Sequence, residues 1–153
     1  MGAREQISLC DHNVWLALML PAHNHHDAAR AWWGRLEAER AVFCRSTQQG
    51  FLRLLTTEAV LVPYGLPART QAQAWAIYHR ISSDPCVGFL TEPAGLGELW
   101  EQLSSRESAS PKLWMDAYLA AFAIKSGCEL VTFDQGFRQF EPHHLRLKWL
   151  GSL

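Results

Sequence analysis

The sequence predicts an α/β protein in which helices cover both faces of a central parallel sheet of about five strands, a three-layer α/β/α sandwich. Four short runs rich in β-branched or aromatic residues recur along the chain, and segments with helical periodicity separate them. Strands that alternate with helices form parallel sheets, because each helix returns the chain to the same edge. The length of 153 residues favours a single domain, 1–153.

The expected strands are four largely apolar runs and one alternating run. They are ISLC at 7–10, AVFC at 41–44, CVGFL at 86–90, ELVTF at 129–133 and LRLKWL at 145–150. Continuous apolar runs are typical of strands buried on both faces. The alternating run at 145–150 therefore suits an edge strand.

The expected helices lie between these strands. Their ranges are 13–20, 25–39, roughly 47–58, 69–83, 96–104 and 110–127. The last helix has marked ends, with Ser110 as the expected N-cap, Pro111 in the first turn and Gly127 where a left-handed C-cap is expected.

Composition excludes some classes of protein. The net charge of −1 and the pI near 6.6 argue against binding of nucleic acid or an anionic membrane through bulk charge. The longest apolar stretch, VWLALML at 14–20, is far shorter than the roughly 20 residues of a membrane helix, and the N-terminus has no signal-peptide segment. We therefore expect a cytoplasmic protein without membrane contact.

Asp116 is the most informative residue of the helix at 110–127. At helical spacing it shares a stripe with apolar residues such as Leu113, Leu119 and Ala120, which should face the core. Burial of a carboxylate is costly unless a partner, hydrogen bonds or a metal ion compensates. The rest of the chain must supply that compensation.

Two further aspartates follow predicted strands, Asp11 after ISLC and Asp134 after ELVTF. Ligands of open α/β sheets bind outside the carboxyl ends of the strands, where the strand order reverses. If these two strands are neighbours, Asp11, Asp116 and Asp134 converge there. Carboxylates that remain ionised together need a cation, and oxygen ligands favour Mg²⁺ or Mn²⁺.

Each aspartate also has a structural interpretation. Asp11 and Asp134 are in suitable positions to cap the helical turns that follow them. Asp116 is one turn after Lys112, and such an ion pair contributes ~0.2–0.5 kcal/mol. The pair explains a surface residue better than one on the core stripe.

The segments SLCDHNVWLAL, STQQGFLRLLT, WMDAYLAAFAIKSG and LVTFDQGF resemble, in order and spacing, the signature segments of PIN-domain nucleases, specifically the VapC-type toxins of bacterial toxin–antitoxin pairs. The resemblance implies a PIN-like sandwich and a metal-dependent ribonuclease that leaves a 5′-phosphate. It also implies a VapB-type antitoxin that masks the active site. With 11% aromatic residues, a two-fold homodimer like that of the resembled toxins is expected.

The resemblance also implies roles for individual residues. The first, third and fourth family acids fall on Asp11, Asp116 and Asp134, the expected ligands of Mg²⁺ or Mn²⁺. Asn13 is the partner in the D-x-N pattern, and the second acid, commonly Glu, falls on Gln48. Gln48 is a departure that removes one negative charge, although its amide can still bind a metal-bound water.

Further contacts are expected around this set. Thr132 and Asn13 would orient ligands, and Arg45, Arg53 and Arg138 are candidate phosphate contacts, although exposed arginines are commonly only solvated surface. The tryptophans are expected to pack in the core or at interfaces. Because Trp32 and Trp33 are adjacent on a helix, one of them is expected to be exposed to an antitoxin helix or dimer partner.

Two other classes of function remain open. Gln48 in place of Glu allows a catalytically silent PIN-like protein that binds RNA or a partner. Strand-end aspartates also occur in phosphotransfer or phosphatase-like domains, but here the pattern is D-H-N rather than D-x-D, and a glycine-rich phosphate loop is missing.

Overall fold

The computed structural model describes residues 6–36 and 40–151. It contains one parallel sheet with the strand order β3-β2-β1-β4-β5. The strands are β1 (Ile7–Cys10), β2 (Arg40–Phe43), β3 (Val87–Phe89), β4 (Glu129–Thr132) and β5 (Arg146–Trp149). All expected strands are confirmed, and the alternating run lies at the edge of the sheet.

Helical segments connect successive strands, because parallel strands need a crossover connection. The α-helices are α1 (His12–Met19), α2 (His26–Trp33), α3 (Arg45–Leu55), α4 (Glu58–Leu61), α5 (Gln71–Ser82), α6 (Leu96–Ser104) and α7 (Leu113–Ser126). Two 3₁₀ segments complete the set, η1 (Val62–Tyr64) and η2 (Gln135–His143).

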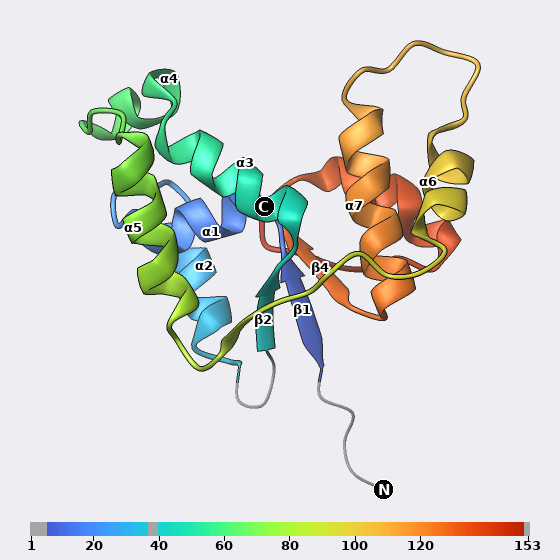
Figure 1. The fold of residues 1–153 in the computed structure, drawn as a ribbon, viewed down its shortest axis with the longest axis horizontal. Helices are drawn as coiled ribbons and strands as arrows, with labels where there is room; N and C mark the ends of the chain where they lie inside the picture. Colours follow the sequence, from blue (N-terminus) through green and yellow to red (C-terminus); the bar gives the residue numbers. More distant parts are fainter. Residues whose placement is uncertain (1–5, 37–39, 152–153) are drawn as a thin grey trace, which may run out of the picture.

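The helices form two layers, one on each face of the sheet (Figure 1). Neighbouring strand residues point to opposite faces. Leu9 packs in the core beneath α6, α7 and η2, whereas Cys10 packs in the core beneath α1, α2, α3 and α5. The alternation repeats on β4, where Leu130 belongs to the first core and Val131 to the second. The three-layer α/β/α prediction is confirmed.

Three helix boundaries differ from the expected ones by three residues or more. The helix expected at 25–39 ends at Trp33, because Gly34 follows and glycine disfavours helix continuation; residues 37–39 lie outside the described chain. The helix expected at 47–58 ends at Leu55, where the Thr56 and Thr57 hydroxyls bond backbone carbonyls of the last turn.

The third difference is at α7, which begins at Leu113 rather than near Ser110. Ser110 and Pro111 form a preceding turn closed by the Leu113 N–H on the Ser110 carbonyl at 3.0 Å. Lys112 is the N-cap residue and has no side-chain cap bond. The C-terminal expectation is confirmed, because Gly127 has φ 69°.

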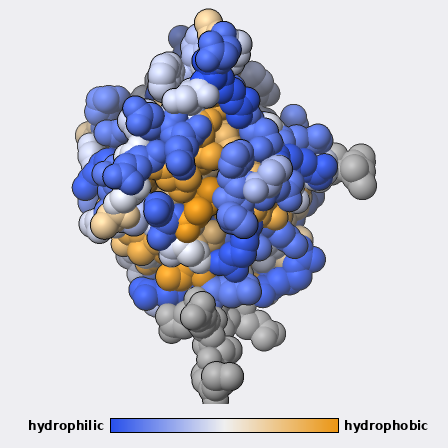
Figure 2. Space-filling model, turned by 90° about the vertical axis from the view of Figure 1, so that its right-hand side faces the viewer, coloured by the Kyte–Doolittle hydropathy of each residue, from blue (hydrophilic) through white to orange (hydrophobic). Residues whose placement is uncertain are grey.

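The exposed aromatic residues are not the expected ones. Trp32 is buried, and Trp33 is half-buried with its ring against Trp15 and Trp32. Trp114 and Met115 at the start of α7 are 58% and 61% exposed. The side of the molecule that carries α6 and α7 shows an apolar strip between hydrophilic borders (Figure 2).

No helix within residues 6–36 and 40–151 is both long and apolar enough to cross a bilayer.

Candidate active site

The strand order places the candidate site at the centre of the sheet. β1 is hydrogen-bonded to β2 on one side and to β4 on the other. The chain adds β2 and β3 on one side of β1 and then β4 and β5 on the other side, so the strand order reverses between β1 and β4. Asp11 follows β1 and extends the ladder, since its N–H donates to the Val131 carbonyl at 2.9 Å. Asp134 follows β4 by two residues. The two strand-end aspartates therefore share one edge, as expected.

Thr132 joins these two aspartates. Its fully buried hydroxyl donates to Asp11 Oδ2 at 2.8 Å and accepts the Asp134 N–H at 3.0 Å. A single hydroxyl thus fixes the Asp11 carboxylate against the turn that carries Asp134. The orienting role expected for Thr132 has this geometric basis.

Both strand-end aspartates also cap helical turns. Asp11 Oδ1 accepts the His12 N–H at 2.8 Å at the start of α1, and Asp134 Oδ1 accepts the Gly136 N–H at 2.8 Å at the start of η2. Capping uses Oδ1 of each aspartate. Asp11 Oδ2 is left for Thr132, and Asp134 Oδ2 is left for a cation.

That cation is Lys112. Its Nζ lies 2.6 Å from Asp134 Oδ2 and 3.3 Å from Asp116 Oδ2. The Lys112 side chain is 71% exposed, but that of Asp116 is only 17% exposed. The ion pair between Lys112 and Asp116 is therefore present, but it is part of a cluster of three side chains that also includes Asp134.

The three carboxylates influence one another electrostatically. Burial raises the pKa of Asp116 above its ordinary value, and the charges of Asp134 and Asp11 add to this, while Lys112 opposes it. Burial also acts to raise the pKa of Asp134, but the Lys112 ammonium and the Gly136 N–H outweigh it and hold that pKa below its ordinary value. Lys112 therefore stabilises the charge of Asp134 more effectively than that of Asp116.

His12 belongs to the site, although sequence reasoning did not select it and its position next to Asp11 is the signal that could have found it. His12 Nδ1 lies 2.8 Å from Asp11 Oδ1. Burial of the ring lowers the pKa of His12, but the hydrogen bond and charge of Asp11, helped by the charge of Asp116, raise it above its ordinary value. The imidazole therefore carries a positive charge at a higher pH than a free histidine.

A cavity of about 370 Å³ opens over this cluster. Its lining includes Asp11, His12, Gly50, Arg53, Lys112 and Asp116, whereas Asp134 reaches it only through its contact with Lys112. Of the candidate phosphate contacts, only Arg53 lines it: Arg45 lies over the Phe89 ring and Arg138 over the Trp149 ring, each 4.9 Å from the centroid. The cavity thus combines carboxylates with cationic side chains.

Gln48 is not among the residues that line this cavity. Its side chain is buried, and its Oε1 accepts a hydrogen bond from Arg45 at 2.6 Å. Gly50, two positions later on α3, lines the cavity instead, and a Cβ there would lie 3.0 Å from His12 Cβ. The structure brings Asp11, Asp116 and Asp134 together but does not bring Gln48 to them.

We expect Gln48→Glu to leave Mn²⁺ affinity unchanged. The new carboxylate would pair with Arg45 outside the cavity, so it would add no ligand. Calorimetric Mn²⁺ titration of parent and variant measures this. Tighter binding in the variant would mean that Gln48 turns toward the metal when an ion binds.

The donor atoms are suitable for a hard cation. They are carboxylate oxygens. Asn13 Oδ1, two residues after Asp11, is buried without a hydrogen-bond partner among the described residues, but Asn13 is not among the residues that line the cavity. Within residues 6–36 and 40–151, no three His, Cys, Asp or Glu side chains are already placed to hold one ion. In the cluster, Lys112 bonds two of the carboxylates.

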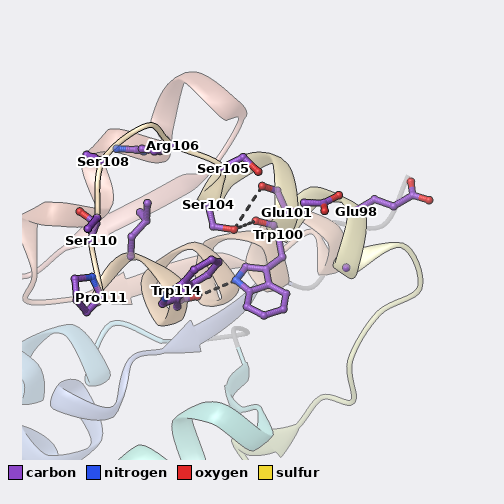
Figure 3. Close-up of a pocket in the computed structure, with 13 residues that line it drawn as sticks. Glu98, Trp100, Glu101, Ser104, Ser105, Arg106, Ser108, Ser110, Pro111 and Trp114 are labelled. Carbon is purple, nitrogen blue, oxygen red and sulfur yellow. Dashed lines mark hydrogen bonds between the residues drawn. The ribbon is translucent and has the colours of Figure 1, made fainter.

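A larger cavity of about 930 Å³ lies elsewhere, between α6 and the connection that leads to α7 (Figure 3). Trp100 Nε1 donates to the Trp114 carbonyl at 2.8 Å in its wall, and the Ser104 hydroxyl donates to the Trp100 carbonyl at 2.6 Å. Its acidic side chains are Glu98 and Glu101, and both come from one helix, α6. Size alone does not make this cavity the reaction site.

Comparison with known proteins places the chain in a family. The PIN domain family model matches residues 8–141. Ribonuclease VapC41 of Mycobacterium tuberculosis is 49% identical over 141 residues, which are 91% of this chain and 97% of the relative. Ribonuclease VapC44 of the same organism is 33% identical over 84% of this chain and 86% of the relative.

Solved structures agree in fold. FitAcB from Neisseria gonorrhoeae superposes with a TM-score of 0.64 at 19% identity, covering 94% of this chain and 97% of that one. The VapBC2 complex from Rickettsia felis, bound to a promoter DNA fragment, has a TM-score of 0.63 at 12% identity and covers 94% of this chain and 98% of that one. Sequence and fold together establish that the chain belongs to the PIN-domain family, in its VapC-type branch.

Proposed function

We propose that the chain is a metal-dependent ribonuclease that acts as the toxin of a toxin–antitoxin pair and hydrolyses RNA phosphodiester bonds. The observation that carries this proposal is the convergence of three aspartates from three separate segments on one side of the sheet, with Thr132 and Lys112 linking them. The names of the relatives, which are ribonucleases of the VapC group, support the same activity.

Asp11, Asp116 and Asp134 would hold Mg²⁺ or Mn²⁺, with Asn13 orienting the ligands. Such an ion lowers the pKa of a bound water and offsets charge on the phosphate. Asp11 is held by Thr132 and by the start of α1, so its position is fixed before any ion binds. The Asp11 carboxylate is therefore already in position and does not have to become ordered during the reaction.

The cationic side chains of the cavity would bind the RNA backbone. Arg53 and Lys112 line it, and His12 gains positive charge from its acidic neighbours. Phosphate contacts of this kind position a strand without reading its sequence. Arg45 and Arg138 lie outside the cavity and would contact only more distant phosphates.

A VapB-type antitoxin is the proposed protein partner. Solved neighbours include toxin–antitoxin complexes, VapBC2 and VapBC-1. Trp114 and Met115 offer exposed apolar surface at the start of α7, and Met115 also lines the cavity of the aspartates. A partner seated there would cover the site. The two-fold homodimer and a cytoplasmic location are further parts of the proposal.

RNA cleavage with and without divalent ions tests the function. We expect the purified chain to cut a mixed RNA substrate with Mg²⁺ or Mn²⁺, to lose that activity in EDTA and to regain it on addition of Mn²⁺. The new ends should carry 5′-phosphates, because water rather than the 2′-hydroxyl attacks. Gel electrophoresis measures the extent of cleavage, and digestion of the products by a 5′-phosphate-dependent exonuclease identifies their 5′ ends.

The alternative outcome is informative. RNA binding without cleavage under all metal conditions would indicate a silent PIN-like binding protein. The observation that favours this second candidate is that α3 brings Gly50 to the cavity rather than a second acid.

A further inference from the structure

Lys112 lies where a cation is needed. Of the two Asp134 oxygens, Oδ1 is held by the Gly136 N–H and Oδ2 by Lys112 Nζ at 2.6 Å. The same Nζ lies 3.3 Å from Asp116 Oδ2. Two of the three carboxylates therefore already have a positive charge between them in the metal-free chain.

We propose that Lys112 is an internal counter-ion of the acidic site, which holds Asp116 and Asp134 together in the metal-free chain and competes with the divalent ion for these two carboxylates. This inference rests on the metal ion of the proposed function. A divalent ion on Asp134 Oδ2 would stand against the ammonium, and like charges at such distances repel. Lys112 must leave its present position when the ion binds.

The side chain can make this movement. It is 71% exposed, so its departure opens no buried space, and its four-carbon stem is flexible. Lys112 is also the N-cap residue of α7, so its backbone stays at the rim of the cavity after the ammonium leaves. The freed charge then faces the space in which a phosphate would bind.

Mn²⁺ binding to the whole chain, followed by the electron paramagnetic resonance signal of the free ion, tests this without any cleavage assay. We expect Lys112→Met to bind Mn²⁺ about three- to tenfold more tightly than the parent, the range for loss of one or two exposed ion pairs. The metal-free variant should melt at a lower temperature, because Asp116 and Asp134 lose their shared cation.

Two variants control for general effects. Lys125→Met removes the same charge from the last turn of α7 and should bind Mn²⁺ as the parent does. Lys112→Arg keeps a cation and should keep affinity near the parental value. Unchanged or weaker Mn²⁺ binding in Lys112→Met, with normal binding by the parent, would overturn this inference but not the proposed function. No Mn²⁺ binding by parent and variant alike would overturn the metal-dependent function as well.

Discussion

Asp116→Asn is expected to lower the rate of RNA cleavage by at least about a hundredfold and to leave the metal-free protein as stable as the parent or more stable. Even residues that only support metal ligands contribute ~10–100-fold to activity, and Asp116 is a proposed ligand. The pKa of Asp116 is raised in the fold, chiefly by burial, so its negative charge reduces folding stability. Asparagine removes that charge.

The sign of the pH dependence follows from the same shift. Because the folded pKa lies above the ordinary value of 3.8, protonated Asp116 contributes stability below that value, and the contribution is lost as the pH rises through the folded pKa. Thermal melts of parent and Asp116→Asn from pH 3 to pH 7 should therefore diverge in favour of the variant. Glu107→Gln, in the exposed connection before α7, controls for loss of one negative charge.

A purely structural Asp116 would behave in the opposite way. Loss of a cap or an ion pair costs stability and spares activity. An Asp116→Asn protein that melts at a lower temperature than the parent and still cleaves RNA would show that Asp116 acts only through its ion pair with Lys112.

Asp11→Ala is expected to have the largest effect on stability, a loss of ~2–4 kcal/mol in the free energy of unfolding. The change removes the cap on the His12 N–H, worth ~1 kcal/mol, and leaves the fully buried Thr132 hydroxyl without its acceptor, worth ~1–3 kcal/mol. Urea unfolding should show a lower midpoint with an unchanged slope. RNA cleavage should be lost at the same time.

Asp11→Asn separates the two roles. Asparagine has one side-chain oxygen, which can keep either the cap on the His12 N–H or the bond from the Thr132 hydroxyl, and it brings no charge to a metal ion. We expect this variant to lose less stability than Asp11→Ala and to lose cleavage. If Asp11→Asn unfolds as easily as Asp11→Ala, the charge itself holds the first turn of α1.

The sequence predicted the sheet and the position of the aspartates because both depend on local pattern. Apolar runs marked each strand, and the polar residue after a strand must lie at its carboxyl end whatever the details of packing. Asp11 and Asp134 were therefore found without knowledge of the strand order. Gly127 was predictable for a similar reason, since a left-handed residue at a helix end is a local requirement.

Other features depend on contacts between distant segments. Gln48 and Gly50 are two positions apart on α3 and so lie on different sides of the helix, and the packing of α3 on α1 decides which of them meets the site. The contact of Lys112 with Asp134 spans 22 residues, so helical spacing revealed only its pair with Asp116. One of Trp32 and Trp33 was expected on the surface, and the packing of Trp33 against Trp15 could not be foreseen because it is likewise non-local.

The link from Thr132 to Asp11 joins residues that are 121 positions apart in the chain. Ribosomes add roughly 5–20 residues per second, so Asp11 is made on the order of 10 s before Thr132 and Asp134. During that interval β1 can pair with β2 on one side but has no β4 on the other, so the acidic site is incomplete. Under the proposed function, a nascent chain therefore has no complete set of metal ligands until synthesis has passed β4. The interleaved strand order would thus delay RNA cleavage until that point.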